Sequence, residues 1–434
     1  MKQTDPLTGY SLFIMLLLAL LASFGWPLLA SLASLAGCFA WFAASRLFVR
    51  LLPMQRIQVL VMLALGAAGL VFGQLQTGGG TRWWLKALEG NQALLSMLLS
   101  VSFLRLVAVS GQASDEKLPV GRQALWKTLL GVHIFGAVIN FSAMIIMADR
   151  LAAKKDLTPL QALIISRGFT LAAHWSPFFA SMGVVLISAP GASLWKLMPV
   201  GLLLAALGLL IAGRLLITKP EAEITNGYPM HWQALTLPLV LALSVLGIHL
   251  LQENIPVLTL VSALSLFFTL VLLVWRYRYK ASGYLRQHIE QTLPSMSGET
   301  LLFLAAGVLA AGLGSALQAA DFSLQLEQFG PWQAWLLLLV LVGISGLGVH
   351  PVISIATAGG LFSPWVSDPN LLGLVFLMTW ALGVSLSPLS GTHLAMQGRY
   401  GISSYAFTRW NLGYVALLLL VQLVALHLYA LFIA

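Results

Sequence analysis

Charged residues are scarce in this sequence, and their scarcity excludes an ordinary soluble globular protein. Of the 434 residues, 9% are charged and 59% are hydrophobic, and the mean hydropathy is +0.90. A typical soluble domain has about 25% charged residues. A bilayer core of about 30 Å needs roughly 20 apolar residues per helical crossing, so the chain could cross on the order of a dozen times. We therefore predict an all-α polytopic membrane protein.

Cysteine and membrane-embedded carboxylates are also nearly absent. The single Cys38 lies in an apolar run, which excludes intrachain disulfides and cysteine metal sites. Asp149 and Glu299 lie only near the ends of apolar runs, so neither a carboxylate proton relay nor an acidic cation site is expected. The sequence has no HExxH, no GxSxG and no recognisable channel filter. We therefore predict neither an enzyme nor a channel, and no metal or cofactor.

Basic residues outnumber acidic residues, and the formal net charge is +9. In a membrane protein this excess marks loops that face the cytoplasm and its anionic lipids. Membrane lipids are therefore expected partners, and nucleic acid is not. The distribution of Lys and Arg predicts a multi-pass protein of a bacterial-type cytoplasmic (inner) membrane, with the N-terminus in the cytoplasm and the C-terminus outside.

Hydropathy predicts eleven transmembrane helices and two further apolar stretches. The eleven are 11–24, 28–44, 57–75, 91–109, 158–188, 197–217, 234–251, 256–275, 299–318, 371–397 and 411–433. The further stretches, 128–148 and 334–364, are interrupted by polar residues, proline or glycine. Basic residues flank the first of them on both sides, so a full crossing would put one basic cluster outside. We therefore predict two re-entrant hairpins that enter from opposite faces, with their turns buried in protein or lining a wet cavity.

Weak internal similarity indicates two inverted repeats. A Gly-Val-His triplet at 131–133 recurs at 348–350, and Ser-Pro at 176–177 recurs at 387–388. The common order and similar spacing favour a genuine repeat, and the loop charges give its two copies opposite orientations. The predicted divisions are an N-terminal helix (1–27), a first repeat (28–218, with hairpin 128–148 and broken helix 158–188) and a second repeat (219–434, with hairpin 334–364 and broken helix 371–397).

Pro177 and Pro388 lie inside the two helices that follow the hairpins. Proline lacks a backbone donor and clashes with the preceding turn, so each helix is expected to break just before it. A single proline could merely kink a packed helix. Interrupted helices at corresponding places of inverted repeats instead indicate a secondary transporter with its site near the bilayer midplane.

Polar residues around the breaks and hairpin turns are the candidate ligands for a substrate or a coupling ion. Hydroxyls can bind a cation or donate to an anion, glycine allows close backbone approach, and histidine can carry a proton. The alternatives are hydroxyls bonded within their own helix and histidines bonded between helices. The candidates are Asn140, Ser142, His174, Ser176, Pro177, Ser354, Thr357, Ser385, Ser387, Pro388, Ser390, Gly391, Thr392 and His393.

Arg167 and Arg399 are candidate anion clamps. An arginine embedded in a membrane is functional by default, although snorkelling of Arg167 and cytoplasmic anchoring by Arg399 are the alternatives. The polar groups expected in the membrane are arginine, histidine, hydroxyls and helix N-termini, and carboxylates are missing among them. This set favours an anionic solute. A coupling Na⁺ would need backbone carbonyls and hydroxyls.

The predicted layout resembles the ion transporter superfamily, which includes the divalent anion:sodium symporters. Those symporters carry Ser-Asn-Thr at both hairpin tips, whereas Asn-Phe-Ser at 140–142 and Ser-Ile-Ala-Thr at 354–357 occupy these places here. The resemblance implies a scaffold domain of crossings one to four and seven to nine. It also implies a mobile transport domain of the hairpins with crossings five, six, ten and eleven, a homodimer joined through the scaffold, and an elevator mechanism.

The sequence thus predicts a secondary active transporter that moves a small anion, with a carboxylate or similar oxyanion favoured, coupled to Na⁺ or H⁺. The alternative is a translocase for a lipid carrier or an envelope polymer. In that case tryptophans at 83, 84, 332 and 335, together with Arg167, would bind a phosphate head group.

The opposite orientation of the repeats predicts that residues 319–333 face outside. This segment contains Asp321 and Glu327 but no Lys or Arg. With Cys38 replaced by serine, a cysteine at Ala320 should react with a membrane-impermeant maleimide added to intact cells. A cysteine at Ser282, in the predicted cytoplasmic basic loop, should react only after permeabilisation. The reverse labelling pattern would rule out the predicted orientation.

Overall fold

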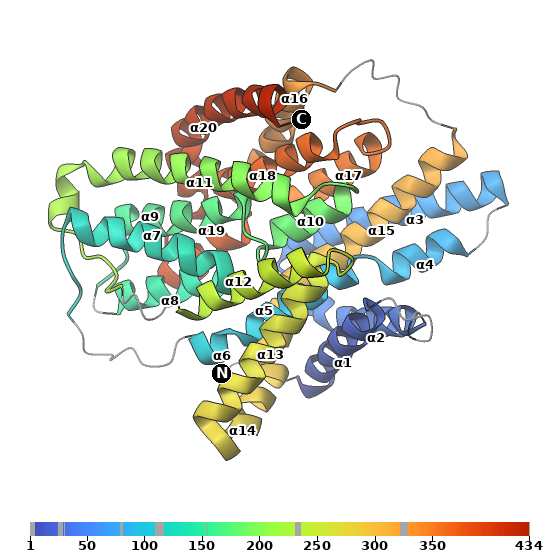
Figure 1. Ribbon diagram of the computed structural model, residues 1–434, viewed down its shortest axis with the longest axis horizontal. Helices are drawn as coiled ribbons and strands as arrows, with labels where there is room; N and C mark the ends of the chain where they lie inside the picture. Colours follow the sequence, from blue (N-terminus) through green and yellow to red (C-terminus); the bar gives the residue numbers. More distant parts are fainter. Residues whose placement is uncertain are drawn as a thin grey trace. The chain divides into compact units, whose positions relative to one another are not determined.

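The protein is helical throughout the part of the chain that the computed structural model describes (Figure 1). The described residues are 5–24, 29, 31–78, 81–108, 117–153, 155–230, 236–321 and 329–433. Within them, an isolated bridge between Val120 and Asn226 is the sole β pairing, so the all-α class is confirmed. In the described part of the chain, seven helices are long and apolar enough to cross a membrane, and four shorter apolar helices accompany them. These helices are those expected of a membrane protein; the eleven crossings and the two terminal orientations stay predictions.

Some parts of the sequence predictions lie outside the described residues. They include Glu327, both ends of the predicted N-terminal helix (1–4 and 25–27) and residues 28, 30, 109, 234 and 235 of the predicted crossings. The described part of that helix is α1 (Pro6–Ala22). Asp321 is described and follows the helix that ends at Ala319.

The chain folds into two compact units, each assembled from separate stretches of sequence. Unit 1 comprises Met1–Ser110, Val240–Gln325 and Ala356–Pro364, and unit 2 comprises Gly111–Leu239, Leu326–Ile355 and Trp365–Ala434. Unit 1 therefore contains the crossings that the resemblance assigns to a scaffold. Unit 2 contains both broken helices, the first hairpin and most of the second, which the resemblance assigns to a transport domain. There are two exceptions: residues 236–239, in predicted crossing seven, belong to unit 2, and Ala356–Pro364, the end of the second hairpin, belongs to unit 1.

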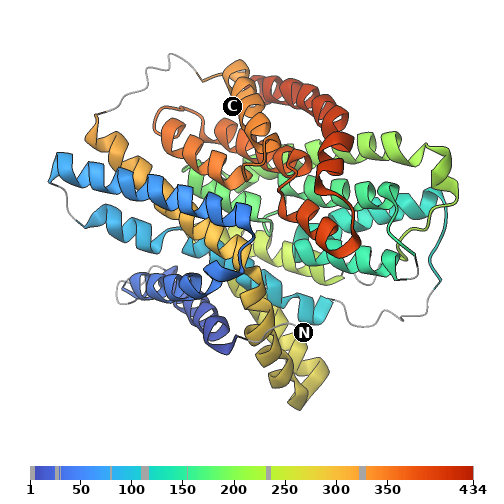
Figure 2. The same ribbon diagram turned by 180° about the vertical axis from the view of Figure 1, so that it is seen from behind.

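Unit 1 is organised around two long helices that pack side by side, α3 and α15 (Figures 1 and 2). A Cβ added to Gly66 of α3 would lie 2.7 Å from the carbonyl oxygen of Val308 in α15, so the two backbones approach closely. The helices of this unit are α1 with α2 (Leu32–Leu47), α3 (Pro53–Thr77), α4 (Arg82–Glu89), α5 (Gln92–Phe103), α6 (Arg105–Ala108), α12 (Thr236–Leu251, from Val240 onward), α13 (Val257–Tyr277), α14 (Ala281–Gln287) and α15 (Ser297–Ala319).

Asp5, at the start of α1, is a buried carboxylate whose charge is fully compensated. It accepts hydrogen bonds from the backbone N–H of Thr8 (3.2 Å) and from its hydroxyl (2.8 Å). It also pairs with Arg50 at 2.8 Å and with Arg46 at 3.4 Å. Burial alone would raise the pKa of Asp5, but the bonds from Thr8 and the two guanidinium charges hold the pKa below its usual value. This buried charge therefore needs no external partner.

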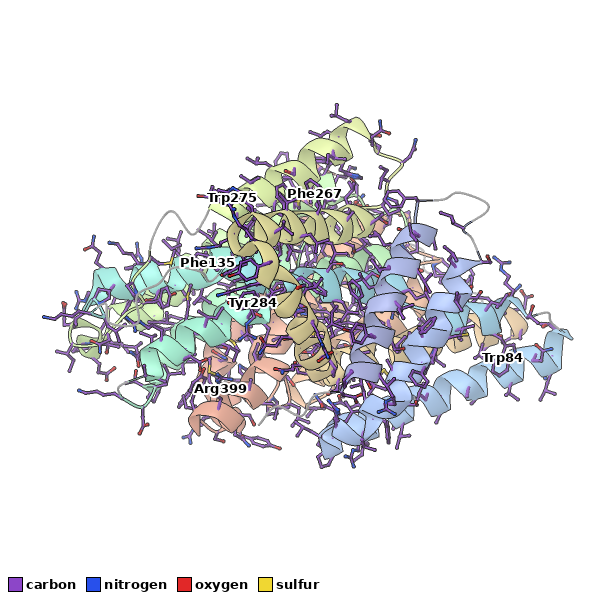
Figure 3. The ribbon with its side chains drawn as sticks, turned by 90° about the horizontal axis from the view of Figure 1, so that it is seen from below. Trp84, Phe135, Phe267, Trp275, Tyr284 and Arg399 are labelled. Carbon is purple, nitrogen blue, oxygen red and sulfur yellow. The ribbon has the colours of Figure 1, made fainter. Side chains whose placement is uncertain are left out.

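Large apolar side chains are exposed along α13, as expected for a helix that faces lipid. Phe267 is 58% exposed and Trp275 is 78% exposed (Figure 3). Tyr284 of α14 is 40% exposed (Figure 3). Aromatic residues beside the basic residues that end α13 are typical of a membrane–water interface.

Unit 2 is built around α18, from Pro369 to Leu386, which is buried along almost its whole length. It packs against α9, α10, α11, α16 and α20 (Figure 1). The helices of this unit are α7 (Arg122–Ile139), α8 (Phe141–Ala152), α9 (Pro159–Leu171), α10 (Ala180–Ser188), α11 (Leu194–Ile217), α16 (Pro331–Gly346), α17 (Pro351–Phe362, as far as Ile355), α18, α19 (Gly391–Tyr400) and α20 (Ser404–Phe432).

Both prolines lie in helix interruptions, where the sequence predicts them. After α9, residues Ala172–His174 form a 3₁₀ turn and the α-helix resumes only at Ala180, so Pro177 lies in the gap. Likewise α18 ends at Leu386 and α19 begins at Gly391, with Pro388 between them. We call 175–179 the first break and 387–390 the second break.

The turn of the first hairpin lies at Asn140, but the second turn differs from the prediction. Asn140, at φ 52°, separates α7 from α8. In the second hairpin α16 ends at Gly346 and α17 begins at Pro351, so Ser354 and Thr357 lie inside α17 and not at the tip. The physical reason is that proline favours the first position of a helix, and Gly348, at φ 101°, supplies the left-handed residue that turns the chain.

The two Gly-Val-His triplets therefore do not occupy equivalent places. His133 lies within α7, whereas His350 lies in the second hairpin turn, where its Nδ1 accepts a hydrogen bond from Val352 N–H at 3.2 Å. The predicted repeat is matched better by the prolines that begin α9 and α18, Pro159 and Pro369, which are 210 residues apart.

Replacing Gly348 by alanine should destabilise the protein, because a Cβ there would meet Leu389 Cδ1 at 2.8 Å and the φ angle is unfavourable for alanine. Such strain costs about 1–3 kcal/mol. Thermal denaturation in detergent should show a lower Tm for Gly348→Ala. Gly343→Ala, in α16 of the same hairpin with nothing within 4 Å, should leave Tm unchanged or raise it. Equal effects of the two changes would contradict this account.

Candidate functional site

Each hairpin turn contacts the break of the helix that follows it. The Nδ2 of Asn140 donates to the carbonyl oxygen of Phe178 at 2.8 Å, and the hydroxyl of Ser176 donates to the carbonyl oxygen of Ala137. The close approach of Gly348 to Leu389 joins the second turn to the second break. The breaks are therefore held in place by packing and hydrogen bonds from the hairpins.

The hydroxyls of the second break mainly bond the break itself. Ser390 caps α19 by accepting the N–H of His393 at 3.4 Å, and its Oγ lies 2.9 Å from Oγ1 of Thr392. The hydroxyl of Ser387 accepts the N–H of Leu389 at 3.3 Å. Gly391 differs from them because it is exposed, and an added Cβ would meet nothing within 4 Å. Its exposed backbone directly follows the second break, at the start of α19.

Arg167, on α9, is a buried cation without a carboxylate partner in the described part of the chain. Its side chain donates from Nε to Oδ1 of Asn411 at 2.9 Å and from Nη2 to the carbonyl oxygen of Trp410 at 3.1 Å. The guanidinium carbon lies 4.1 Å from the centre of the Tyr414 ring. Nη1 is buried and has no hydrogen-bond partner among the described residues. Arg167 is 3% exposed.

The burial of Arg167 is unusual within this protein. Among the described residues, Asp5 and Arg167 are the only buried side chains of the Asp, Glu, Lys and Arg types. Asp5 has two arginines, whereas Arg167 has only neutral acceptors and an aromatic face. Neutral hydrogen bonds compensate a buried charge only in part. The Arg167 guanidinium therefore keeps a net positive charge, and both N–H groups of its buried Nη1 are unused.

Asn411 connects Arg167 to the second break. Its Oδ1 accepts from Arg167, and its Nδ2 donates to the carbonyl oxygen of Ser385 at 2.8 Å. Arginine can only donate and a carbonyl can only accept, so the orientation of the amide is fixed. The hydroxyl of Ser385 lies 2.7 Å from Oγ1 of Thr170 on α9. The end of α18 is thus hydrogen-bonded to α9 and α20 directly beside Arg167.

His393, on α19, completes this arrangement. Its Nδ1 lies 2.8 Å from the carbonyl oxygen of Ser387, so Nδ1 carries the proton. Its Nε2 therefore accepts from the hydroxyl of Ser166, at 3.2 Å. The ring stacks on Phe407 with centres 4.4 Å apart. We call Ser166, Arg167, Thr170, Ser385, His393 and Asn411, all at most 3% exposed, the Arg167 cluster.

The first break has two histidines bonded in the same way. His174 donates from Nδ1 to Leu171 O at 3.1 Å, and its Nε2 lies 3.0 Å from Nε2 of Gln422. His133 donates from Nδ1 to Gly168 O at 3.1 Å and accepts from the Trp175 indole at 3.1 Å. Both rings are thus bonded as neutral imidazoles. These contacts fit histidines that hold helices together by hydrogen bonds, which was the alternative to a proton-carrying role.

Arg399 is already paired with a carboxylate of this chain (Figure 3). Its Nε and Nη2 donate to the two carboxylate oxygens of Asp149 at 2.7 and 2.6 Å. The hydroxyl of Tyr400 donates to the same carboxylate at 2.7 Å. This network joins α19 to α8, so the guanidinium of Arg399 is engaged in holding the hairpin.

The remaining candidates lie away from the Arg167 cluster or contribute only backbone geometry. Ser142 is half-buried in the first turn of α8. Ser354 donates to Pro351 O at 3.0 Å inside α17, and Thr357 lies in the part of α17 that belongs to unit 1. Pro177 and Pro388 act by interrupting their helices. The cluster therefore unites Arg167, Ser385 and His393 from the predicted set.

Sequence reasoning missed the contribution of α20. Asn411, Tyr414 and Gln422 are buried, and all three contact residues of α9 or of the 3₁₀ turn that follows it. Their spacing of three and then eight residues keeps them on one face of a helix. The pattern was visible as polar residues at helical spacing in an otherwise apolar run. Ser166 and Thr170, next to Arg167 and one turn beyond it, share that helical periodicity.

Comparisons with known proteins do not identify a relative. No protein-family model matches the chain, and no curated protein matches it. Among the described residues, no group of three or more His, Cys, Asp or Glu side chains could hold a metal ion. Conclusions about function therefore rest on the geometry of unit 2.

Asn411→Leu should destabilise the protein, because it leaves Nε of Arg167 and the carbonyl oxygen of Ser385 without partners. A buried group that loses its partner costs about 1–3 kcal/mol. Thr408→Val is the matched control on α20, because the hydroxyl of Thr408 is buried without a partner. Thermal denaturation should show a lower Tm for Asn411→Leu and an unchanged Tm for Thr408→Val. An unchanged Tm for Asn411→Leu would contradict the proposed link.

Proposed function

We propose that the protein is a secondary active transporter of small anions and that the Arg167 cluster of unit 2 binds the anion. One observation carries the proposal, namely a buried guanidinium with a free Nη1 and no carboxylate partner in the described chain. A buried charge without a counter-charge costs several kcal/mol, so proteins rarely keep one without a function. An oxyanion at Nη1 would supply both the missing charge and the missing acceptors.

The surroundings of Arg167 support transport over simple binding. The second break begins at Ser387, two residues after Ser385, whose carbonyl is tied to Arg167 through Asn411. Anion binding could therefore alter a helix interruption, which is the structural element that moves or rearranges in many secondary transporters. Gly391 supplies exposed backbone beside the cluster.

The division into two units supports an elevator mechanism as part of this proposal. Unit 2 contains the whole Arg167 cluster, so it could carry a bound anion as one body while unit 1 serves as the scaffold. We propose this mechanism in a bacterial-type inner membrane, with a homodimer formed through unit 1. Coupling to Na⁺ or H⁺ stays a prediction.

Anions should stabilise the wild-type protein, and this stabilisation should require Arg167. A ligand at 100 times its Kd stabilises by about 2.7 kcal/mol. Tm would be measured at constant ionic strength with acetate, lactate, succinate, phosphate and a polyprenyl phosphate. A rise in Tm with a soluble anion for wild type and Arg409→Gln, but not for Arg167→Gln, is expected.

Arg409 is the matched control because it lies on α20, near the cluster in sequence, but is exposed. An equal anion response in Arg167→Gln would remove Arg167 from the binding site. A response to polyprenyl phosphate alone would favour the lipid-carrier translocase. No response of the wild type to any of these compounds would argue against the proposed function.

A further inference from the structure

When no anion is bound, the Arg167 cluster carries a net positive charge. Arginine stays protonated in proteins, and its three described neighbours are an amide, a carbonyl and an aromatic ring. The other groups of the cluster are hydroxyls and the neutral ring of His393. No second buried Lys or Arg accompanies it in the described part of unit 2. The empty cluster therefore carries one uncompensated charge.

A singly charged anion would neutralise the cluster, and a doubly charged anion would not. One carboxylate can accept a hydrogen bond from Nη1 and cancel the charge of one guanidinium. A second carboxylate would be left without a buried cation. A Na⁺ ion beside Arg167 would instead add a second positive charge at short range, which is unfavourable where water is excluded.

We infer that the protein exchanges singly charged carboxylates across the membrane, with the anion bound at Arg167 required for the carrier to cross in either direction. This inference rests on the proposed function and adds its substrate class and driving force. With a bound monocarboxylate the cluster is neutral, whereas the empty cluster would carry a bare charge through the membrane. The loaded carrier therefore crosses more easily than the empty one, and uptake needs an anion on the opposite side.

Purified protein in liposomes would be tested with ¹⁴C-lactate in a zwitterionic buffer whose only other anion is sulfate, which is doubly charged and should not support exchange. Liposomes preloaded with unlabelled lactate should take up label at least about tenfold faster than liposomes without internal lactate. The rate should not depend on Na⁺ or on a pH gradient. Internal acetate should support exchange, and internal succinate should not.

Three outcomes would overturn the inference. Equally fast uptake into unloaded liposomes, driven by Na⁺ or H⁺, would refute exchange but leave anion transport intact. Exchange supported by succinate as well as by lactate would refute the inference that the exchanged anion must be singly charged. No uptake under any condition, together with no anion effect on Tm, would refute the proposed function itself.

A second pair of variants tests the charge argument without transport. Asn411→Asp would place a carboxylate where Arg167 Nε now meets an amide oxygen, so it should abolish the Tm response to lactate. Its Tm without ligand is no test, because aspartate cannot donate to the carbonyl oxygen of Ser385 as Asn411 does. Gln422→Glu makes the same amide-to-acid change on α20, but beside His174, and should keep the lactate response. A retained response in Asn411→Asp would contradict charge compensation by the anion.

Discussion

A buried guanidinium without a counter-charge is the constraint that organises unit 2. Arg167 cannot lose its proton, so every group around it must accept a hydrogen bond or present a negative face. Asn411, the carbonyl oxygen of Trp410 and the ring of Tyr414 meet this need, and all three belong to α20. The position of α20 against α9 is thus fixed by electrostatics as well as by apolar packing. Because Asn411 also binds Ser385 O, the same constraint extends to the end of α18.

Asp5 shows how this chain treats a buried charge that has only a structural role. It caps a helix, receives two hydrogen bonds from Thr8 and pairs with two arginines. Even Arg399, which is exposed, has a carboxylate partner, since Asp149 binds its guanidinium through both carboxylate oxygens. Against these two examples, the lack of a described carboxylate at Arg167 is a specific feature and not a general property of the fold. The difference between the three sites is the strongest argument that Arg167 has a ligand.

The parts of the structure set by local chemistry could be predicted from the sequence, and the parts set by long-range contacts could not. Both breaks could be predicted because proline interrupts a helix. Arg167 could be singled out because charged residues are rare in the apolar segments. The second hairpin turn was wrongly placed at 354–357, whereas Gly348 and Pro351 turn the chain. Asn411 could not be matched to Arg167, since the two are separated by 244 residues and nothing in either local sequence names the other.

The histidines show why hydrogen-bond geometry decides between two uses of the same residue. In sequence, a histidine beside a helix break fits either a proton carrier or a fixed contact. His133 accepts from the Trp175 indole, which can only donate, so protonation of Nε2 would set two donors against each other. The Ser166 hydroxyl and the Gln422 amide can reorient, so His393 and His174 could accept a proton at the cost of rearranging their partners. A proton on His393, whose partner Ser166 directly precedes Arg167 in the chain, would add a second positive charge to a cluster that lacks one negative charge already. The electrostatics of the Arg167 cluster thus favour anion binding over proton binding.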